Sequence, residues 1–341
     1  MSVRRIVSLL LLTALSAPAS VSPSQSAALP RAITPPTQTV AGLERELPYL
    51  TLAEPEPVLG SYHSEHFTFR YTGSLDESLL EEIAQLCEAT RFAVQELPLD
   101  ITYPVPTSAF EIHLFQTEPS YLDAGGIQGT AGIYLPSEAR TLIRLDLLTQ
   151  APKGEPAPLN HRRAKTLVHE VTHQLQHQWM GKVPIWLLEG IAVYMESIPI
   201  SEEGKFLFES IHFRQSESVS RCTTNRLSVT NLEHLMGMSG HEWIEHFQAN
   251  PLSVHRNYLS AYLLTYYFLH LEGEGDASTL CQYIRKMEKA SNKQAYEKAD
   301  QLLLNGKSMD ELEADLIAAY QNEGMTLVPI NGHLLSYHKA L

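Results

Sequence analysis

Hydrophobic and polar residues alternate in three short segments of the first half of the chain. These segments are residues 66–71, 110–115 and 141–145. Such alternation is typical of β-strands with one buried face. Residues 76–97 instead repeat their apolar positions at helical spacing, and Ser74 or Asp76 is suited to cap the start of that helix. The pattern predicts a small β-sheet and one long helix before residue 150.

The rest of the chain has mainly helical patterns. Residues 164–179 predict a helix with an apolar side that carries Leu167, Val168, Val171, Leu175 and Trp179. Residues 186–196 predict a second, almost wholly apolar helix. Further helical patterns follow at 231–248, 257–271, 277–291 and 309–321. We predict an α+β fold in which an N-terminal lobe, residues 58–200, precedes a mainly α-helical lobe, residues 201–341.

The predicted helix at 164–179 contains the sequence His169-Glu170-Val171-Thr172-His173. Residues four apart lie on one face of a helix, so His169 and His173 can point both imidazoles at one metal ion. Glu170 lies beside the pair, where it can take a proton from a metal-bound water. The alternative is a pair of core histidines on an ordinary buried helix.

Two other histidine patterns predict no metal site. His177 continues the stripe of His169 and His173, but positions i, i+4 and i+8 span about 12 Å, too far for one zinc ion. We expect His177 to pack or to support a ligand. His241 and His246 frame an H-E-x-x-x-H sequence, in which five residues turn the two imidazoles roughly 140° apart. This second sequence predicts a solvated amphipathic segment.

The apolar helix at 186–196 carries a single interior carboxylate in the sequence Trp186-Leu187-Leu188-Glu189-Gly190-Ile191-Ala192-Val193-Tyr194-Met195-Glu196. Burial would penalise Glu189 unless it were paired or bound to a metal, and the small Gly190 and Ala192 allow close helix packing. Together with the H-E-x-x-H sequence, this pattern resembles the gluzincin zinc peptidases. Within them it is most similar to exported peptidase MA-like proteins, and it also resembles the aminopeptidase N branch.

The resemblance implies a zincin-like N-terminal lobe with a small mixed sheet and the H-E-x-x-H helix. It also implies one Zn²⁺ per chain, held by His169, His173 and Glu189, with an open position for water. In aminopeptidase N relatives, a Tyr at the start of a comparable apolar helix donates to the tetrahedral intermediate. Tyr258 matches it by position, Tyr262 is the second candidate, and a plain aromatic core is the alternative.

One aminopeptidase feature is missing from this chain. Those enzymes hold the free N-terminus of the substrate with the Glu of a G-x-M-E-N strand, whereas the comparable residues 125–134 contain no Glu. Aminopeptidase specificity is therefore not expected. Residues 130–135 still predict an edge strand, which either pairs with an extended peptide through main-chain hydrogen bonds or is an ordinary sheet edge.

The N-terminal sequence predicts export. Arg4 and Arg5 precede an apolar run at 6–15, and small residues follow, so residues 1–19 have the pattern of a secretory signal peptide. The run is short for a membrane-spanning helix, and a retained anchor is the alternative. Residues 20–57, rich in Pro and Ser, predict an extended tether. We expect a periplasmic or extracellular protein with no stable membrane insertion after signal cleavage.

Net charge and cysteine content limit the binding partners and the disulfides that we expect. A net charge of −14, from 39 acidic and 25 basic residues, argues against nucleic acid or anionic membrane as partners. Three cysteines are too few for a disulfide scaffold, and one disulfide, Cys222–Cys281, is the pairing we favour.

The sequence as a whole predicts an exported zinc peptidase that acts on peptides or proteins. Glu170 is the expected general base, and Tyr258 or Tyr262 is the expected oxyanion donor. A zinc hydrolase of another amide, such as a cell-wall peptide or a small molecule, is one alternative. A non-catalytic zinc-containing binding protein is the other.

Overall fold

The structure is a computed structural model that describes most of the chain after residue 58. The described residues are 59–101, 103, 108–149, 161–180, 182–201, 203–220, 222–249, 251–291 and 293–330. They all belong to one compact unit. The predicted signal peptide and tether, residues 1–57, lie outside the described residues.

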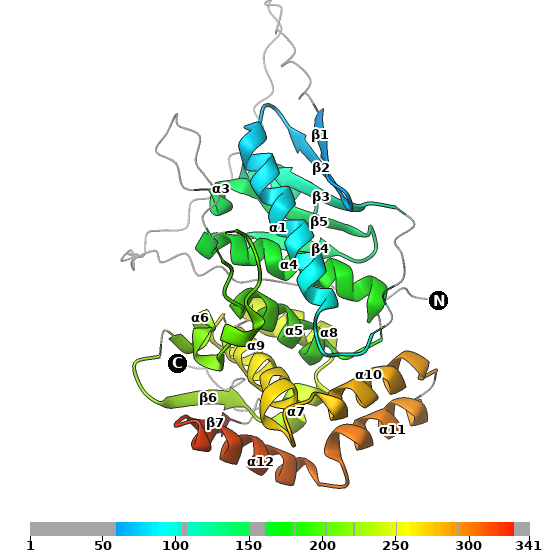
Figure 1. The fold of residues 1–341 in the computed structure, drawn as a ribbon, viewed down its shortest axis with the longest axis vertical. Helices are drawn as coiled ribbons and strands as arrows, with labels where there is room; N and C mark the ends of the chain where they lie inside the picture. Colours follow the sequence, from blue (N-terminus) through cyan, green and yellow to red (C-terminus); the bar gives the residue numbers. More distant parts are fainter. Residues whose placement is uncertain are drawn as a thin grey trace, which may run out of the picture. The chain divides into compact units, whose positions relative to one another are not determined.

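The first half of the described chain forms a five-stranded mixed sheet in the order β1-β2-β3-β5-β4 (Figure 1). Its strands are β1 (Leu59–His63), β2 (Phe67–Thr72), β3 (Phe110–Phe115), β4 (Gly132–Leu135) and β5 (Arg140–Arg144). The three central strands run parallel, and the two edge strands run antiparallel to their neighbours. The three strands predicted from alternation are therefore confirmed. Strand β1 was not predicted, because it buries no face completely and so lacks an apolar alternation.

Strand β4 forms one edge of this sheet, as predicted for residues 130–135. The backbone N–H of Arg144 donates to the carbonyl of Ala131 at 2.9 Å, which makes these two a hydrogen-bonded pair. Because pairing alternates along antiparallel strands, the N–H and C=O groups of Gly132 and Tyr134 point away from β5. These groups have no strand partner in the part of the chain that the structure describes.

Two long helices cover one face of the sheet. Helix α1 (Glu77–Gln95) begins after Asp76, which caps it by accepting the N–H of Ser78, and it lies beside α4 (His161–Trp179) (Figure 1). The apolar side predicted for α4 is buried against the sheet and α1, in the main hydrophobic core. The prediction of helices at 76–97 and 164–179 is therefore confirmed, with ends shifted by a few residues.

The remaining elements form the second half of the unit. Its longer helices are α5 (Ile185–Ser197), α8 (Gly240–Ala249), α9 (Pro251–Tyr266), α10 (Ser278–Lys289), α11 (Lys293–Leu304) and α12 (Met309–Asn322). The short elements of the chain are α2 (Glu118–Asp123), α3 (Leu145–Leu148), η1 (Phe208–Ser210), η2 (Phe213–Gln215), α6 (Glu217–Ser220), α7 (Leu232–Gly237) and the π-helix η3 (Tyr267–Leu271). The protein is thus a mixed α+β fold with a small mixed sheet and many helices.

The structure corrects three details of the predicted helical region. Strands β6 (Arg226–Thr230) and β7 (Thr326–Ile330) pair in parallel there, although only helices were expected. The predicted helix at 231–248 is broken at Ser239, because Ser239 and Glu242 cap the start of α8 reciprocally. Helix α9 begins at Pro251, a residue suited to the first helical position, so Tyr258 lies in the middle of its helix and not at its start.

The predicted Cys222–Cys281 disulfide is wrong, because all three cysteines are free thiols. The thiol of Cys281 donates to the carbonyl of Pro98, while that of Cys222 donates to the carbonyl of Ser218 one helical turn earlier. The two thiols therefore lie against different parts of the chain. No helix in the described ranges is long and apolar enough to cross a membrane.

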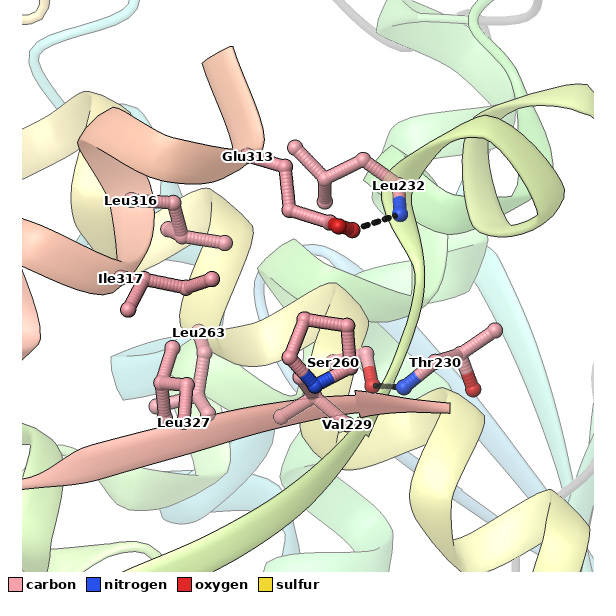
Figure 2. A pocket seen from close by; sticks show the side chains of 10 residues that line it. Val229, Thr230, Leu232, Ser260, Leu263, Glu313, Leu316, Ile317 and Leu327 are labelled. Atoms are coloured by element: carbon pink, nitrogen blue, oxygen red, sulfur yellow. Dashed lines mark hydrogen bonds between the residues drawn. The ribbon is translucent and has the colours of Figure 1, made fainter. Parts of the chain in front are cut away.

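A small cavity lies between the β6–β7 pair and helices α9 and α12 (Figure 2). Its walls are mostly apolar, and its polar groups already have partners. Glu313 accepts the backbone N–H of Leu232 at 2.7 Å, and Ser260 accepts that of Thr230 at 2.8 Å. With its hydrogen-bonding groups occupied, this cavity does not point to a ligand.

Gly190 sets the close packing of α5 against α9, which confirms the role expected of a small residue there. A Cβ atom at this position would lie 2.5 Å from the carbonyl oxygen of Ala261 and would also collide with the hydroxyl of Thr265. Backbone atoms of a packed helix cannot move aside cheaply. The approach of α5 to α9, and with it the position of Glu189, therefore depends on the missing side chain.

We expect Gly190→Ala to lower the free energy of unfolding by about 1–3 kcal/mol, because overpacking forces the two helices apart. Urea unfolding followed by circular dichroism measures this change. Gly237→Ala is the matched control, since a Cβ there would meet no atom within 4 Å. Equal stability of the two variants would contradict the packing role of Gly190.

Candidate metal centre

Helices α4 and α5 bring two imidazoles and one carboxylate together in the protein interior. The Nε2 atoms of His169 and His173 lie 2.9 Å apart, and the Oε2 atom of Glu189 lies 3.3 Å from the first and 3.2 Å from the second. These residues are at most 3% exposed. In the described part of the chain they form the one group of His, Cys, Asp or Glu residues that could hold a metal ion.

The dimensions of this triangle fit a tetrahedral metal site. Four ligands about 2.0–2.1 Å from a zinc ion would lie about 3.3–3.4 Å from one another. The three observed separations, 2.9–3.3 Å, are close to that value. The second oxygen of Glu189 is buried and has no hydrogen-bond partner among the described residues. A bound cation would offset the cost of burying this carboxylate.

The other nitrogen of each imidazole has an acceptor of its own. Nδ1 of His169 lies 3.2 Å from Oε2 of Glu196, and Nδ1 of His173 lies 3.0 Å from Oε1 of Gln176. A proton on each Nδ1 leaves the Nε2 lone pairs free for a metal ion and fixes the ring orientations. Gln176 also donates to the carbonyl of Leu188, so it connects α4 to the residue before Glu189.

Protonation of His169 competes with metal binding. Burial by itself would lower the pKa of this imidazole, but its hydrogen bonds to Glu189 and Glu196 outweigh burial and raise the pKa. The two carboxylates therefore attract either a proton or a metal cation to this position. Metal binding must release that proton, because the ligand form of histidine is neutral at Nε2.

Glu170 lies next to the triangle formed by His169, His173 and Glu189, but its carboxylate is not part of that triangle. It is fully buried, and neither of its oxygens has a hydrogen-bond partner within the described ranges. Strand β4 passes over it so closely that a Cβ on Gly132 would lie 2.9 Å from its Cγ. Burial raises the pKa of Glu170 to about 8, against the opposing effects of the His169 charge and of the neighbouring backbone of Tyr134. A cation held by the triangle would shift the carboxyl back toward its charged form.

The two candidate tyrosines have different surroundings. The ring of Tyr258 packs edge-on against His169 with 6.2 Å between centroids, and its buried hydroxyl has no partner in the described chain. Burial and the charges of Glu189 and Glu170 raise its pKa, so the phenol stays protonated and able to donate. Tyr262 instead donates to the carbonyl of Phe213 at 3.3 Å. The structure therefore brings Tyr258, and not the hydroxyl of Tyr262, to the metal centre.

The histidines for which the sequence predicts no metal site, His177, His241 and His246, lie outside the metal-binding group. Nδ1 of His177 pairs with the hydroxyl of Tyr134 at 2.8 Å, which ties α4 to strand β4. His241 is exposed near Glu245, whereas His246 packs against His234 and accepts from Asn257. The segment is not fully solvated as predicted, because Trp243 between the two histidines is buried.

Two supporting residues were missed in the sequence. Gln176 follows His173 by three positions, a spacing that brings side chains together on a helix, and this signal was available. Glu196 stands in the same sequence pattern as Glu189, seven residues later. The spacing of seven residues places it on the same helix face as Glu189, two turns further along, but does not show that it reaches His169.

Comparisons with known proteins do not assign the chain to a family. No protein-family model matches the chain, and no curated protein matches it. Evidence on function therefore comes from the geometry of its residues.

We expect a divalent metal ion to stabilise the fold. Free Zn²⁺ at a hundred times its dissociation constant should add about 2.7 kcal/mol to the free energy of unfolding. His173→Ala should abolish this increment, because it removes one of three ligands. Thermal unfolding of both proteins with Zn²⁺ and with a chelator measures the effect. A zinc-dependent increase of equal size in His173→Ala would contradict the site.

Glu196→Ala should weaken Zn²⁺ binding by about 10–100-fold, since loss of the acceptor frees the His169 ring to turn and reduces its basicity. Competition with a chromophoric chelator gives the dissociation constant. Glu245→Ala removes an exposed carboxylate and serves as the matched control. Unchanged affinity in Glu196→Ala would show that the hydrogen bond to His169 does not support the ligand.

Proposed function

We propose that this protein is a zinc-dependent peptidase of the gluzincin type. One observation carries the proposal: Glu170, a buried carboxylate with no side-chain hydrogen-bond partner in the described chain, lies beside a three-ligand metal triangle in the protein interior. A purely structural metal site usually closes its fourth position with protein and has no need of a neighbouring base. The triangle has three protein ligands and an adjacent acid–base group, which supports a hydrolytic role.

Zinc is the metal that suits this donor set best. Two imidazole nitrogens and one carboxylate oxygen at tetrahedral spacing are typical ligands of catalytic zinc. When bound by His169, His173 and Glu189, zinc would lower the pKa of a water molecule and polarise the carbonyl of the substrate.

Glu170 is the proposed general base. It accepts a proton from the water that attacks the carbonyl carbon, and it passes this proton to the nitrogen of the departing amine. The C–N bond breaks as the proton arrives, so the hydroxyl of the water ends on the new carboxyl group. Burial supports this role, because it raises the pKa of Glu170 and so makes the carboxylate a stronger base than an exposed one.

Tyr258 is the proposed donor to the oxyanion. Its hydroxyl lies in the same buried environment as Glu170 and Glu189, and those carboxylates influence its pKa. A phenol that donates to the developing negative charge stabilises the transition state more than the ground state. The engaged hydroxyl of Tyr262 makes that residue the weaker of the two candidates.

The edge strand supports a peptide as the substrate. The main-chain groups of Gly132 and Tyr134 point away from β5, and Gly132 lies directly against Glu170. An extended peptide added to this edge would run past the general base with its backbone hydrogen-bonded to β4. A small amide without an extended backbone would gain nothing from this edge.

The deep burial of the ligands favours one alternative, a metal site that binds without catalysis. His169, Glu170 and Glu189 are each 0% exposed, so a substrate can reach them only if the elements around them move apart. The two roles differ in what Glu170 does. As a base it is essential for turnover, whereas in a binding site it is a buried charge without a function.

We also propose that the protein acts outside the cytoplasm. The support is the signal-peptide pattern of residues 1–19, together with an acidic net charge that suits a soluble exported enzyme.

Glu170→Gln should keep one zinc per chain and lose turnover by about a hundredfold or more, because it removes the general base and leaves the ligands in place. Elemental analysis gives the zinc content, and digestion of a mixed peptide library followed by mass spectrometry gives cleavage and its preferred bond. Glu245→Gln, an exposed substitution of the same kind, is the control and should cleave like the wild type.

Three outcomes decide between the roles. Cleavage by the wild type alone, with zinc in both proteins, supports the peptidase. Zinc in both proteins with no cleavage by either contradicts a general peptidase and favours the binding site. Absence of zinc from both contradicts the metal centre itself.

A further inference from the structure

Tyr258 has a second buried aromatic neighbour besides His169. Trp243, on α8, packs edge-on against the Tyr258 ring, with 5.2 Å between centroids and 84° between planes. Trp243 is 1% exposed, and its indole Nε1 has no hydrogen-bond partner within the usual distance and angle among the described residues. The Tyr258 hydroxyl is likewise without one. The indole N–H of Trp243 and the hydroxyl of Tyr258 are therefore neighbouring buried polar groups that each lack another hydrogen-bond partner among the described residues.

The chemistry of the two groups is complementary. An indole N–H can only donate, whereas a phenol hydroxyl can accept a hydrogen bond and donate another at the same time. An indole N–H left unpaired in the interior is energetically costly, because it has lost its hydrogen bond to water. Trp243 already lies close enough to lower the pKa of Tyr258, against the larger opposing effect of burial.

Helix α8 is held firmly beside Tyr258. The side-chain amide of Asn257, the residue before Tyr258, donates to Nδ1 of His246 on α8 at 3.3 Å. The carbonyl of the same amide accepts the hydroxyl of Thr230 at 2.7 Å, which adds a connection to β6. Trp243 is therefore fixed in relation to Tyr258 by polar contacts as well as by ring packing.

On the basis of the proposed peptidase function, we propose that Trp243 is a positioning residue. Its indole N–H donates to the Tyr258 hydroxyl, so the hydrogen of that hydroxyl is directed toward the metal centre. Accepting one hydrogen bond also strengthens the one that the phenol donates, because chained hydrogen bonds polarise each other. Without the indole N–H, the hydroxyl loses its fixed direction, and its donation to the oxyanion weakens.

The hydrogen bond itself can be tested without any activity. The chain has three tryptophans, Trp179, Trp186 and Trp243, so ¹⁵N-labelled indole groups give three signals, assigned by substituting each Trp with Phe. Tyr258→Phe keeps the aromatic ring and removes only the acceptor. We expect it to move the Trp243 signal and to leave the other two in place. An unmoved Trp243 signal would overturn the proposal.

The consequence for catalysis is tested by a double-mutant cycle on the zinc-loaded enzyme. Trp243→Phe should lower kcat about tenfold, less than the loss of an oxyanion donor, and should leave KM and zinc affinity nearly unchanged. In the Tyr258→Phe background the same substitution should cause no further loss. Equal losses in both backgrounds would overturn the proposal, because they would show that Trp243 acts by packing alone.

A second variant guards against misfolding of Trp243→Phe. Replacement of Trp243 by β-(3-benzothienyl)alanine keeps the size of the ring and exchanges the N–H for sulfur. The same tenfold loss of kcat supports the hydrogen bond, and wild-type kcat contradicts it. If the zinc-loaded wild type cleaves no peptide, the proposed function fails, while the indole signal still decides whether Trp243 donates to Tyr258.

Discussion

Where helix α5 packs against α4, it buries one carboxylate completely, that of Glu189, and this burial is energetically costly. A charged oxygen in the interior is costly unless positive charge or hydrogen donors surround it. Here the Nε2 atoms of His169 and His173 converge on one of its oxygens, and the other has no partner in the described chain. This arrangement is hard to explain by protein contacts alone, and a cation at the centre of the triangle gives it a physical reason.

The neighbouring elements fix how α4 and α5 pack together around the candidate metal site. Gly190, the residue after Glu189, lets α5 lie against α9, and α9 in turn carries Tyr258 to the His169 ring. Strand β4 lies against Glu170 at Gly132. The centre is therefore enclosed by an edge strand and a helix, each at a place where glycine allows close approach.

Short-range patterns in the sequence predicted the parts of the site that lie on one helix. The spacing of His169 and His173 predicts a shared face, and alternation predicts β2, β3 and β5. The contacts between elements were beyond such patterns. Trp243 is an example: its segment reads as amphipathic and solvated, and only the packing of α8 on α9 brings it to Tyr258. Strands β6 and β7 were missed for the same reason, because their partners lie about a hundred residues apart.

The location of the ligands along the chain has a consequence for the order in which the centre is assembled. His169 and Glu189 are only 20 positions apart, so closing the α4–α5 hairpin costs little chain entropy. Tyr258 and Trp243 belong to helices that leave the ribosome later. A nascent chain that ends before α8 therefore contains all three candidate metal ligands but neither Tyr258 nor Trp243, the two residues proposed to act on the oxyanion.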